Sequence, residues 1–195
     1  MTSSTNKYRF SFTAGALLHG EMVLAANELI HHDFKLERLS ASVLNKNRSK
    51  TNKREFAEVA LRLKTLDEKE IEFLANGSLA LSKQVALLAC VRAYSFIRDF
   101  FFCVILDKVS LFDFSLTERD YISFVRNREL DHPELEALAD STKYKVKQVL
   151  FRILDQAELI DSIKSKHINP NFLEPRLGAW LTEQGKLNEV KLLLG

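Results

Sequence analysis

Residues 79–109 form a very apolar stretch, and any fold of this chain must bury it. A membrane-spanning helix needs about 18 to 20 apolar residues in succession. This stretch is instead divided by charged side chains into runs of at most eight uncharged residues. The dividing residues are Lys83, Arg92, Arg98, Asp99 and Asp107. We therefore predict a long, buried central helix from about Ser82 to Lys108, in a protein without a membrane span.

The composition favours an all-α protein. The 195 residues are 46% hydrophobic and 28% charged, with only 6 Gly and 3 Pro, which is typical of a globular, helix-rich chain. We expect a helical bundle around the central helix, with an N-terminal helical part over 1–78. The central helix and a C-terminal part would occupy 79–195, or the whole chain would pack as one domain.

The segment Ser141 to Asp161 has the spacing of an amphipathic helix, with Val146, Val149, Leu150, Ile153, Leu154 and Ala157 on one face. Ser141 or Thr142 would cap its start. Three lysines nevertheless occupy the first two turns, where the positive end of the helix dipole disfavours cations. They are Lys143, Lys145 and Lys147.

Two segments have the layout of a helix-turn-helix. In the first half, a short helix at 36–44 and the turn NKNRSK precede a longer helix at 51–66. In the second half, a helix beginning at Pro133 precedes the Ser141 helix, and the polar sequence at 159–173 resembles a small wing. The second helix of such a motif presents its first turns to nucleic acid, where cations contact phosphates.

Charge is segregated along the chain although the net charge is only +2. Residues 36–64 carry a local charge of +5, and residues 107–140 a local charge of −5. Together with the helix pattern, this predicts a nucleic-acid-binding surface on the two basic helices. Tyr144, Lys145, Gln148, Phe151 and Arg152 would point away from the core. The predicted binding residues are Arg48, Lys50, Lys53, Arg54, Lys143, Tyr144, Lys145, Lys147, Gln148 and Arg152.

Nothing in the sequence indicates catalysis, a metal site or a cofactor. The motifs HExxH, GxSxG, GxGxxG and the Walker-type loop are not present in the chain. Cys90 and Cys103 lie in apolar sequence without a metal-binding spacing, so we expect two buried free thiols. The N-terminal sequence MTSSTNKYRF has no apolar core before a cleavage site, so no signal peptide is predicted.

Five segments together resemble the BrxA family, small helical proteins of BREX bacteriophage-defence systems. The resemblance implies an all-helical, non-enzymatic, cytoplasmic protein associated with DNA binding, with an architecture related to a helical antitermination factor. It also implies partners: a methyltransferase, an ATPase and a phosphatase-like protein. The family supplies no site residues, and the tail from Gly178 lies outside the resemblance. The segments are FSFTAGALL (10–18), RLKTLDEKEIEFLANGS (62–78), RAYSFIRDF (92–100), HPELEALADSTKYKVKQVLFRILDQAEL (132–159) and EPRL (174–177).

Three functions fit these patterns. The leading one is a non-catalytic protein, monomeric or weakly dimeric with the monomer favoured, that binds double-stranded DNA through its phosphates. The second is a helical scaffold that binds only proteins, with the acidic stretch 107–140 as its docking surface. The third is an RNA-binding, antitermination-like protein. The lysines of the Ser141 helix could also be a solvated face without a function.

Overall fold

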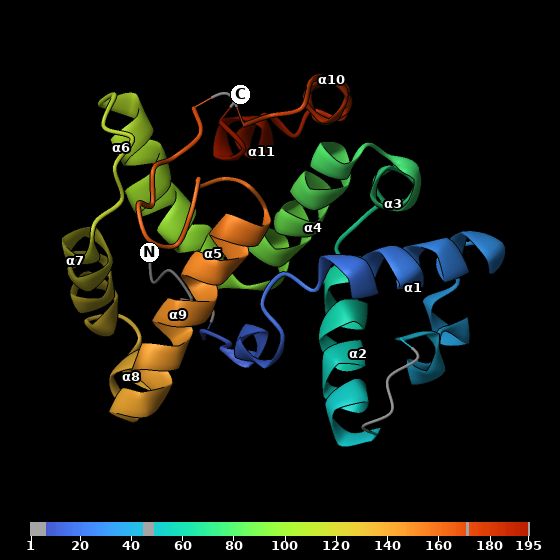
Figure 1. The fold of residues 1–195 in the computed structure, drawn as a ribbon, viewed down its shortest axis with the longest axis horizontal. Coiled ribbons are helices and arrows are strands. Elements are labelled where there is room, and N and C mark those ends of the chain that lie inside the picture. The colour runs from blue at the N-terminus through green and yellow to red at the C-terminus, as the bar shows by residue number, and fades with distance from the viewer. Residues whose placement is uncertain (1–6, 45–48, 171, 195) are drawn as a thin grey trace, which may run out of the picture.

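The computed structural model of the protein describes residues 7–44, 49–170 and 172–194, and within these ranges the regular structure is helical (Figure 1). The all-α prediction is confirmed. The α-helices are α1 (His19–His31), α2 (Ser49–Leu63), α3 (Glu68–Asn76), α4 (Leu79–Ala93), α5 (Ser95–Phe100), α6 (Leu106–Ser110), α7 (Glu118–Glu129), α8 (Pro133–Glu136), α9 (Asp140–Gln156), α10 (Pro175–Glu183) and α11 (Leu187–Leu192). The 3-10 turns are η1 (Ser11–Ala14), η2 (Leu36–Arg38) and η3 (Ala41–Leu44), and η4 (Phe101–Ile105) is a π-helix.

Local capping explains where several helices begin. Thr117 and Asp120 form a capping box at the start of α7. Pro133 occupies the first turn of α8, where its fixed φ fits a helix. The predicted cap of α9 is wrong, because this helix begins at Asp140 after Ala139, without a side-chain cap. The Asp140 carboxylate lies in its first turn, where it complements the helix dipole.

The apolar stretch is not one long helix. Tyr94 has extended backbone angles (φ −127°, ψ 105°) and separates α4 from α5. The next segment widens into the π-helix η4 before α6 begins. Most of the stretch is nevertheless buried, including the completely covered Phe101 of η4, but Leu79 and Phe102 are 61% and 43% exposed. The prediction of burial is therefore confirmed for most of the stretch, and the prediction of a continuous helix is wrong.

One cluster of buried side chains runs through the described chain, from Tyr8 to Leu193. It includes Phe12 and Leu29 from the first predicted part, and Phe100 from the second. In Figure 1, α4 and α5 lie at the centre, with α1 to α3 on one side and α6 to α9 on the other. The predicted boundary at residue 78 stays a prediction. None of the described helices is long and apolar enough to cross a membrane.

Neither predicted helix-turn-helix consists of two full helices. The segment 36–44 forms the two 3-10 turns η2 and η3, and the helix before α9 is the single turn α8. The predicted wing is not a β-hairpin in the described part of the chain. It contains only isolated bridges, which pair Ile160 with Ile168 and Ser115 with His167. Its polar centre is instead stabilised by side-chain bonds such as Ser165 Oγ to Asp161.

Tyr94 joins α2 to the core through buried polar contacts. Its hydroxyl donates to Glu58, and it accepts a hydrogen bond from Arg62 Nε at 3.2 Å. Arg62 is completely covered and also donates to the Leu17 carbonyl at 2.6 Å. Ser11 of η1 donates to Glu58 at 3.0 Å. The break between α4 and α5 at Tyr94 therefore places the Tyr94 hydroxyl between Glu58 and Arg62 of α2.

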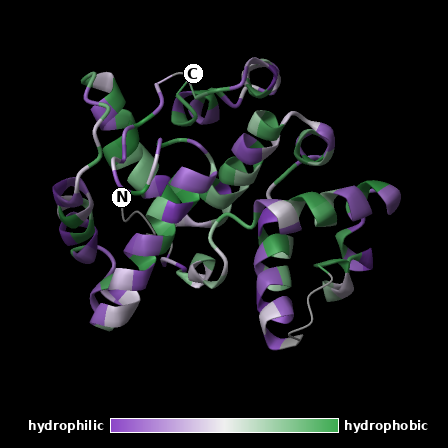
Figure 2. Cartoon of the chain, in the orientation of Figure 1, coloured by the Kyte–Doolittle hydropathy of each residue, from purple (hydrophilic) through white to green (hydrophobic). Residues whose placement is uncertain are grey.

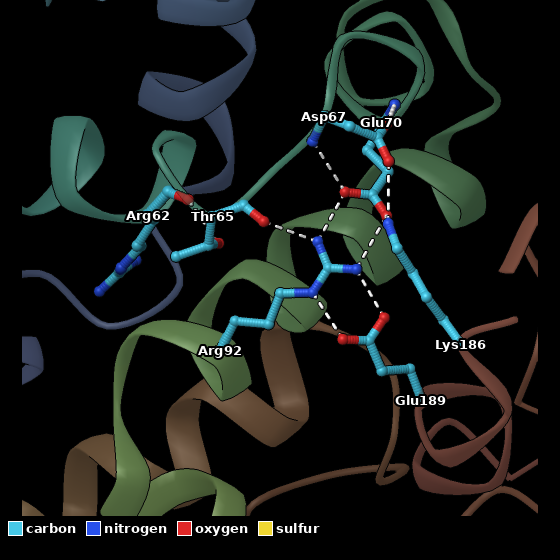
Figure 3. Close-up of polar contacts among 7 residues, drawn as sticks. All are labelled: Arg62, Thr65, Asp67, Glu70, Arg92, Lys186 and Glu189. Atoms are coloured by element: carbon cyan, nitrogen blue, oxygen red, sulfur yellow. Dashed lines mark hydrogen bonds and ion pairs between the residues drawn. The ribbon is translucent and has the colours of Figure 1, made fainter. Parts of the chain in front are cut away.

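A second network joins the C-terminal helix to α3 and α4 (Figure 3). Arg92 bonds Glu70 through both terminal nitrogens, at 2.6 and 2.8 Å. It bonds Glu189 of α11 through two nitrogens at the same distances. Lys186 bridges Asp67 and Glu70 at 2.9 Å each. Burial alone would lower the pKa of Arg92, but the bonds to Glu70 and Glu189 raise it, so this guanidinium stays charged.

We predict that Tyr94→Phe lowers the free energy of unfolding by about 2 to 4 kcal/mol, because it removes one partner from each of two buried charged groups. Urea unfolding measures this loss. Tyr121→Phe is the matched control, because Tyr121 is also buried but its hydroxyl makes no hydrogen bond to a described residue. The control should change the free energy by less than about 0.5 kcal/mol. Equal effects of the two substitutions would contradict the role of the Tyr94 hydroxyl.

The charge of Asp67 should make stability depend on pH in acid. Burial would raise the pKa of Asp67, but hydrogen bonds from Lys186 and the Glu70 amide outweigh it and lower that pKa. A lowered pKa stabilises the fold above the unfolded value, about 3.9, and this contribution is lost as the pH falls through the folded value. Asp67→Asn keeps an N-cap oxygen but removes the charge. The variant should therefore be less stable than the parent at pH 6 and approach it near pH 2.5, and two parallel urea-unfolding curves across this range would contradict the prediction.

Candidate nucleic-acid interface

The exposed face of α2 carries a stripe of cations. Lys50, Lys53 and Arg54 are exposed and follow helical spacing, while Val59 and Leu63 turn to the core. These three cations make no ion pair within the described part of the chain. Arg48, which the sequence places beside them, lies outside the described residues.

The exposed face of α9 carries a second stripe. Lys145, Gln148 and Arg152 are exposed and lie at positions i, i+3 and i+7. Tyr144 beside them is 59% exposed. Neither Lys145 nor Arg152 forms an ion pair with a described residue. The prediction that these four side chains point away from the core is therefore confirmed.

Phe151 does not belong to this exposed face, contrary to the prediction. Only 3% of its surface is accessible, and its ring contacts Phe100 and Tyr121 with centroids at 6.3 and 6.0 Å. The amphipathic pattern missed this because the core of α9 has two sides, one against η1 and α4 and another against α7. A residue outside the main apolar stripe is thus buried by the second neighbour.

The other two lysines of α9 are paired within the protein. Lys143 Nζ lies 2.7 Å from Glu129 Oε1, and Lys147 Nζ lies 2.8 Å from Glu118 Oε2. Both carboxylates belong to α7. Lys147 also lies over the ring of Tyr144, 5.6 Å from its centroid. The crowding of lysines near the start of α9 is thus relieved by acids that lie before it in the sequence.

The N-terminal segment around η1 lies between α2 and α9 in space and contacts both helices. The 3-10 turn η1 packs against both α2 and α9. After it, the Leu17 amide donates to Gln156 Oε1 of α9 at 3.0 Å. A groove of about 460 Å³ lies here, lined by Glu55 of α2, Gln156 of α9 and residues between Gly15 and Glu21. In Figure 1 both helices begin at the lower edge of the view, and Figure 2 shows hydrophilic residues in purple along each.

Sequence reasoning missed the groove residues and the acids of α7. Gln156 continues the spacing of Lys145, Gln148 and Arg152 by one further turn, so helical spacing alone could have found it. Glu118 and Glu129 had no such signal, because their pairing depends on how α7 packs against α9.

Cys90 is a buried free thiol, as predicted, but Cys103 is free and exposed. Its sulfur accepts a hydrogen bond from Arg128 Nη2 at 2.7 Å, in a small pocket between η4 and α7. The described residues contain no cluster of three or more His, Cys, Asp or Glu side chains that could hold a metal ion.

Comparison with known proteins gives consistent results. The chain is 27% identical over 154 residues to "BREX protein BrxA" of Escherichia coli O9:H4 (strain HS), covering 79% of this chain and 72% of that protein. It is 26% identical over 161 residues to "BREX protein BrxA" of Bacillus cereus (strain H3081.97), covering 80% of each. The crystal structure of an uncharacterized protein from Magnetospirillum magneticum has the same fold, with a TM-score of 0.79 at 18% identity over 97% of this chain and 100% of that one.

The sequence model of the BrxA family matches residues 6–185, which include both basic helices, the groove between them and the acids of α7. This protein therefore belongs to the BrxA family.

Proposed function

We propose that this protein is a non-catalytic component of a BREX defence system that binds double-stranded DNA through α2 and α9. The observation that carries the proposal is the pair of exposed stripes. Lys50, Lys53 and Arg54 of α2, and Lys145 and Arg152 of α9, have no carboxylate partner among the described residues. Unpaired cations on two helices that both pack on η1 suit the phosphates of one polyanion.

The helices also have the right form for duplex DNA. An α-helix fits the major groove of B-DNA, whereas the major groove of an RNA duplex is too deep and narrow for side chains to read. On α9, Gln148 lies between Lys145 and Arg152, so the cations can contact phosphates while the amide reaches a base edge. Because most of these contacts are to phosphates, we expect weak sequence preference.

The defence role rests on the relatives, two of which are named as BREX proteins. On this proposal the protein acts beside the other proteins of the system: the methyltransferase, the ATPase and the phosphatase-like protein. Its removal from a strain that carries a complete BREX system should reduce protection against phage. Plaque counts test this part, and unchanged counts would contradict it.

The acidic stretch offers less support for a purely protein-binding scaffold. Asp113 and Asp120 pair with Lys108, and Glu118 and Glu129 pair with lysines of α9. Several of the acids expected to form a docking surface are therefore neutralised within the protein. Titration with a short duplex of mixed sequence separates the two functions. No binding even at about 50 mM salt would favour the scaffold, and stronger binding to a structured RNA competitor would favour RNA.

Lys145→Ala with Arg152→Ala should weaken duplex binding several-fold or more. About five phosphate contacts predict a slope of log K against log salt of about −4 to −5, and the double variant should flatten this slope by about two. Arg119→Ala with Arg126→Ala is the charge-matched control, because these two exposed cations belong to α7 and not to the stripes of α2 and α9. If the α9 variant binds with the parent's salt dependence, α9 is an ordinary solvated helix.

Reversing the α2 stripe should have a larger effect. Lys50, Lys53 and Arg54 changed together to Glu should abolish duplex binding, because three attractive contacts become repulsive. All three side chains are exposed, so the helical circular-dichroism signal and the thermal midpoint should stay close to those of the parent. Unchanged affinity would remove α2 from the interface and leave α9 alone.

A further inference from the structure

The ion pairs between α7 and α9 divide the cations of α9 into two groups. Lys143 and Lys147 are turned toward α7, whereas Lys145 and Arg152 face solvent. The later lysine pairs with the earlier glutamate, so the two helices run antiparallel where they meet. Glu118 also lies 3.7 Å from Lys166. Two carboxylates of α7 thus face three cations.

These pairs are not needed to hold α7 in place. The two helices already contact each other through the buried rings of Tyr121 and Phe151. The charged groups are only partly covered, with 27% of the Lys147 side chain and 49% of the Glu118 side chain accessible. Ion pairs at such exposure contribute little to stability. Their main consequence is therefore electrostatic.

The pairs also change what a polyanion would gain from these lysines. A free surface lysine that contacts a phosphate releases a counterion from the nucleic acid, which gives affinity and salt dependence. A lysine already bonded to a carboxylate must first give up that partner, and the carboxylate would then repel the phosphates. The hydrogen bond from Lys147 lowers the pKa of Glu118, so this carboxylate is charged at neutral pH.

We propose that Glu118 and Glu129 are affinity-limiting residues of the DNA interface, because they neutralise Lys143 and Lys147 and leave α9 only two free cations. This inference rests on the proposed DNA binding. On this inference the acids of α7 weaken DNA binding, whereas a contact residue strengthens it. Such a limit keeps binding weak and its salt dependence shallower than four free cations would give, as suits a protein that must leave one stretch of DNA for another.

The test compares Glu118→Gln with Glu129→Gln against a control of equal net charge. The control changes Glu72, which pairs with Lys69 on α3, and the exposed Glu136 on α8, both to Gln. Both double variants gain the same net charge, but only the first frees lysines of α9. With a duplex of about 20 base pairs in about 50 to 300 mM salt, the first should steepen the salt slope by about two. It should bind about tenfold more tightly near 0.1 M salt, and the control less than about threefold.

A second pair of substitutions guards against an indirect effect. Lys143→Ala with Lys147→Ala should leave the parent's salt slope unchanged, since these lysines are already neutralised. In the Glu118→Gln, Glu129→Gln background the same change should remove the gain. If the lysine variant flattens the parent's slope by about two, both lysines already contact phosphate and the inference is overturned.

The outcomes separate this inference from the proposed function. A parent that binds duplex while the glutamine variant gains nothing, or no more than its control, overturns the inference and leaves DNA binding intact. A parent that does not bind, with a glutamine variant that does, upholds the limiting role and overturns DNA binding as the native activity. If neither protein binds, both proposals fail.

Discussion

The position of α2 depends on three buried polar side chains: Glu58, Tyr94 and Arg62. Arg62 is completely covered, and removing a charge from water is costly unless its donors find good acceptors. The Tyr94 hydroxyl accepts from Nε and the Leu17 carbonyl accepts from Nη1, while Nη2 is buried without a hydrogen-bond partner among the described residues. These partners come from the break between α4 and α5 and from the loop after η1, so the hydrogen bonds of one guanidinium fix three segments relative to one another. The loop then contacts α9 through Leu17 and Gln156, which carries the same constraint to the second basic helix.

What the sequence could predict follows from the range of each interaction. Capping and periodicity act over a few residues, so the proline start of α8 and most of the buried face of α9 were predicted correctly. The break at Tyr94 was not predictable in this way, because its partners on α2 lie more than thirty residues earlier. The prediction that Phe151 points away from the core failed for the same reason. The helical period alone was enough to predict that Lys145, Gln148 and Arg152 are exposed. Their role at an interface stays a prediction.

The segregation of charge along the chain has a different meaning in the folded protein. The acidic stretch and the basic start of α9 are adjacent in sequence, and antiparallel packing of α7 on α9 brings part of each together. Opposite blocks of charge therefore cancel locally, and the net surface charge at the interface depends on residues that fail to pair. The exposed cations of α2 are not neutralised by the acids of the same helix. Glu58 is buried with Tyr94, and Glu55 lines the groove.

The C-terminal network joins α11 to the core without leaving the buried Glu70 unpaired. Lys186 and Glu189 follow the last residue matched by the family model, yet both contact the buried pair of Glu70 and Arg92. One is a cation and the other an anion, so together they leave the net charge of the cluster unchanged. Glu70 is completely covered and already has Arg92 as a bidentate partner before α11 is considered. In this protein, α11 covers that pair further and fastens the end of the chain to α3 and α4, on the opposite side of the core from the starts of α2 and α9 (Figure 1).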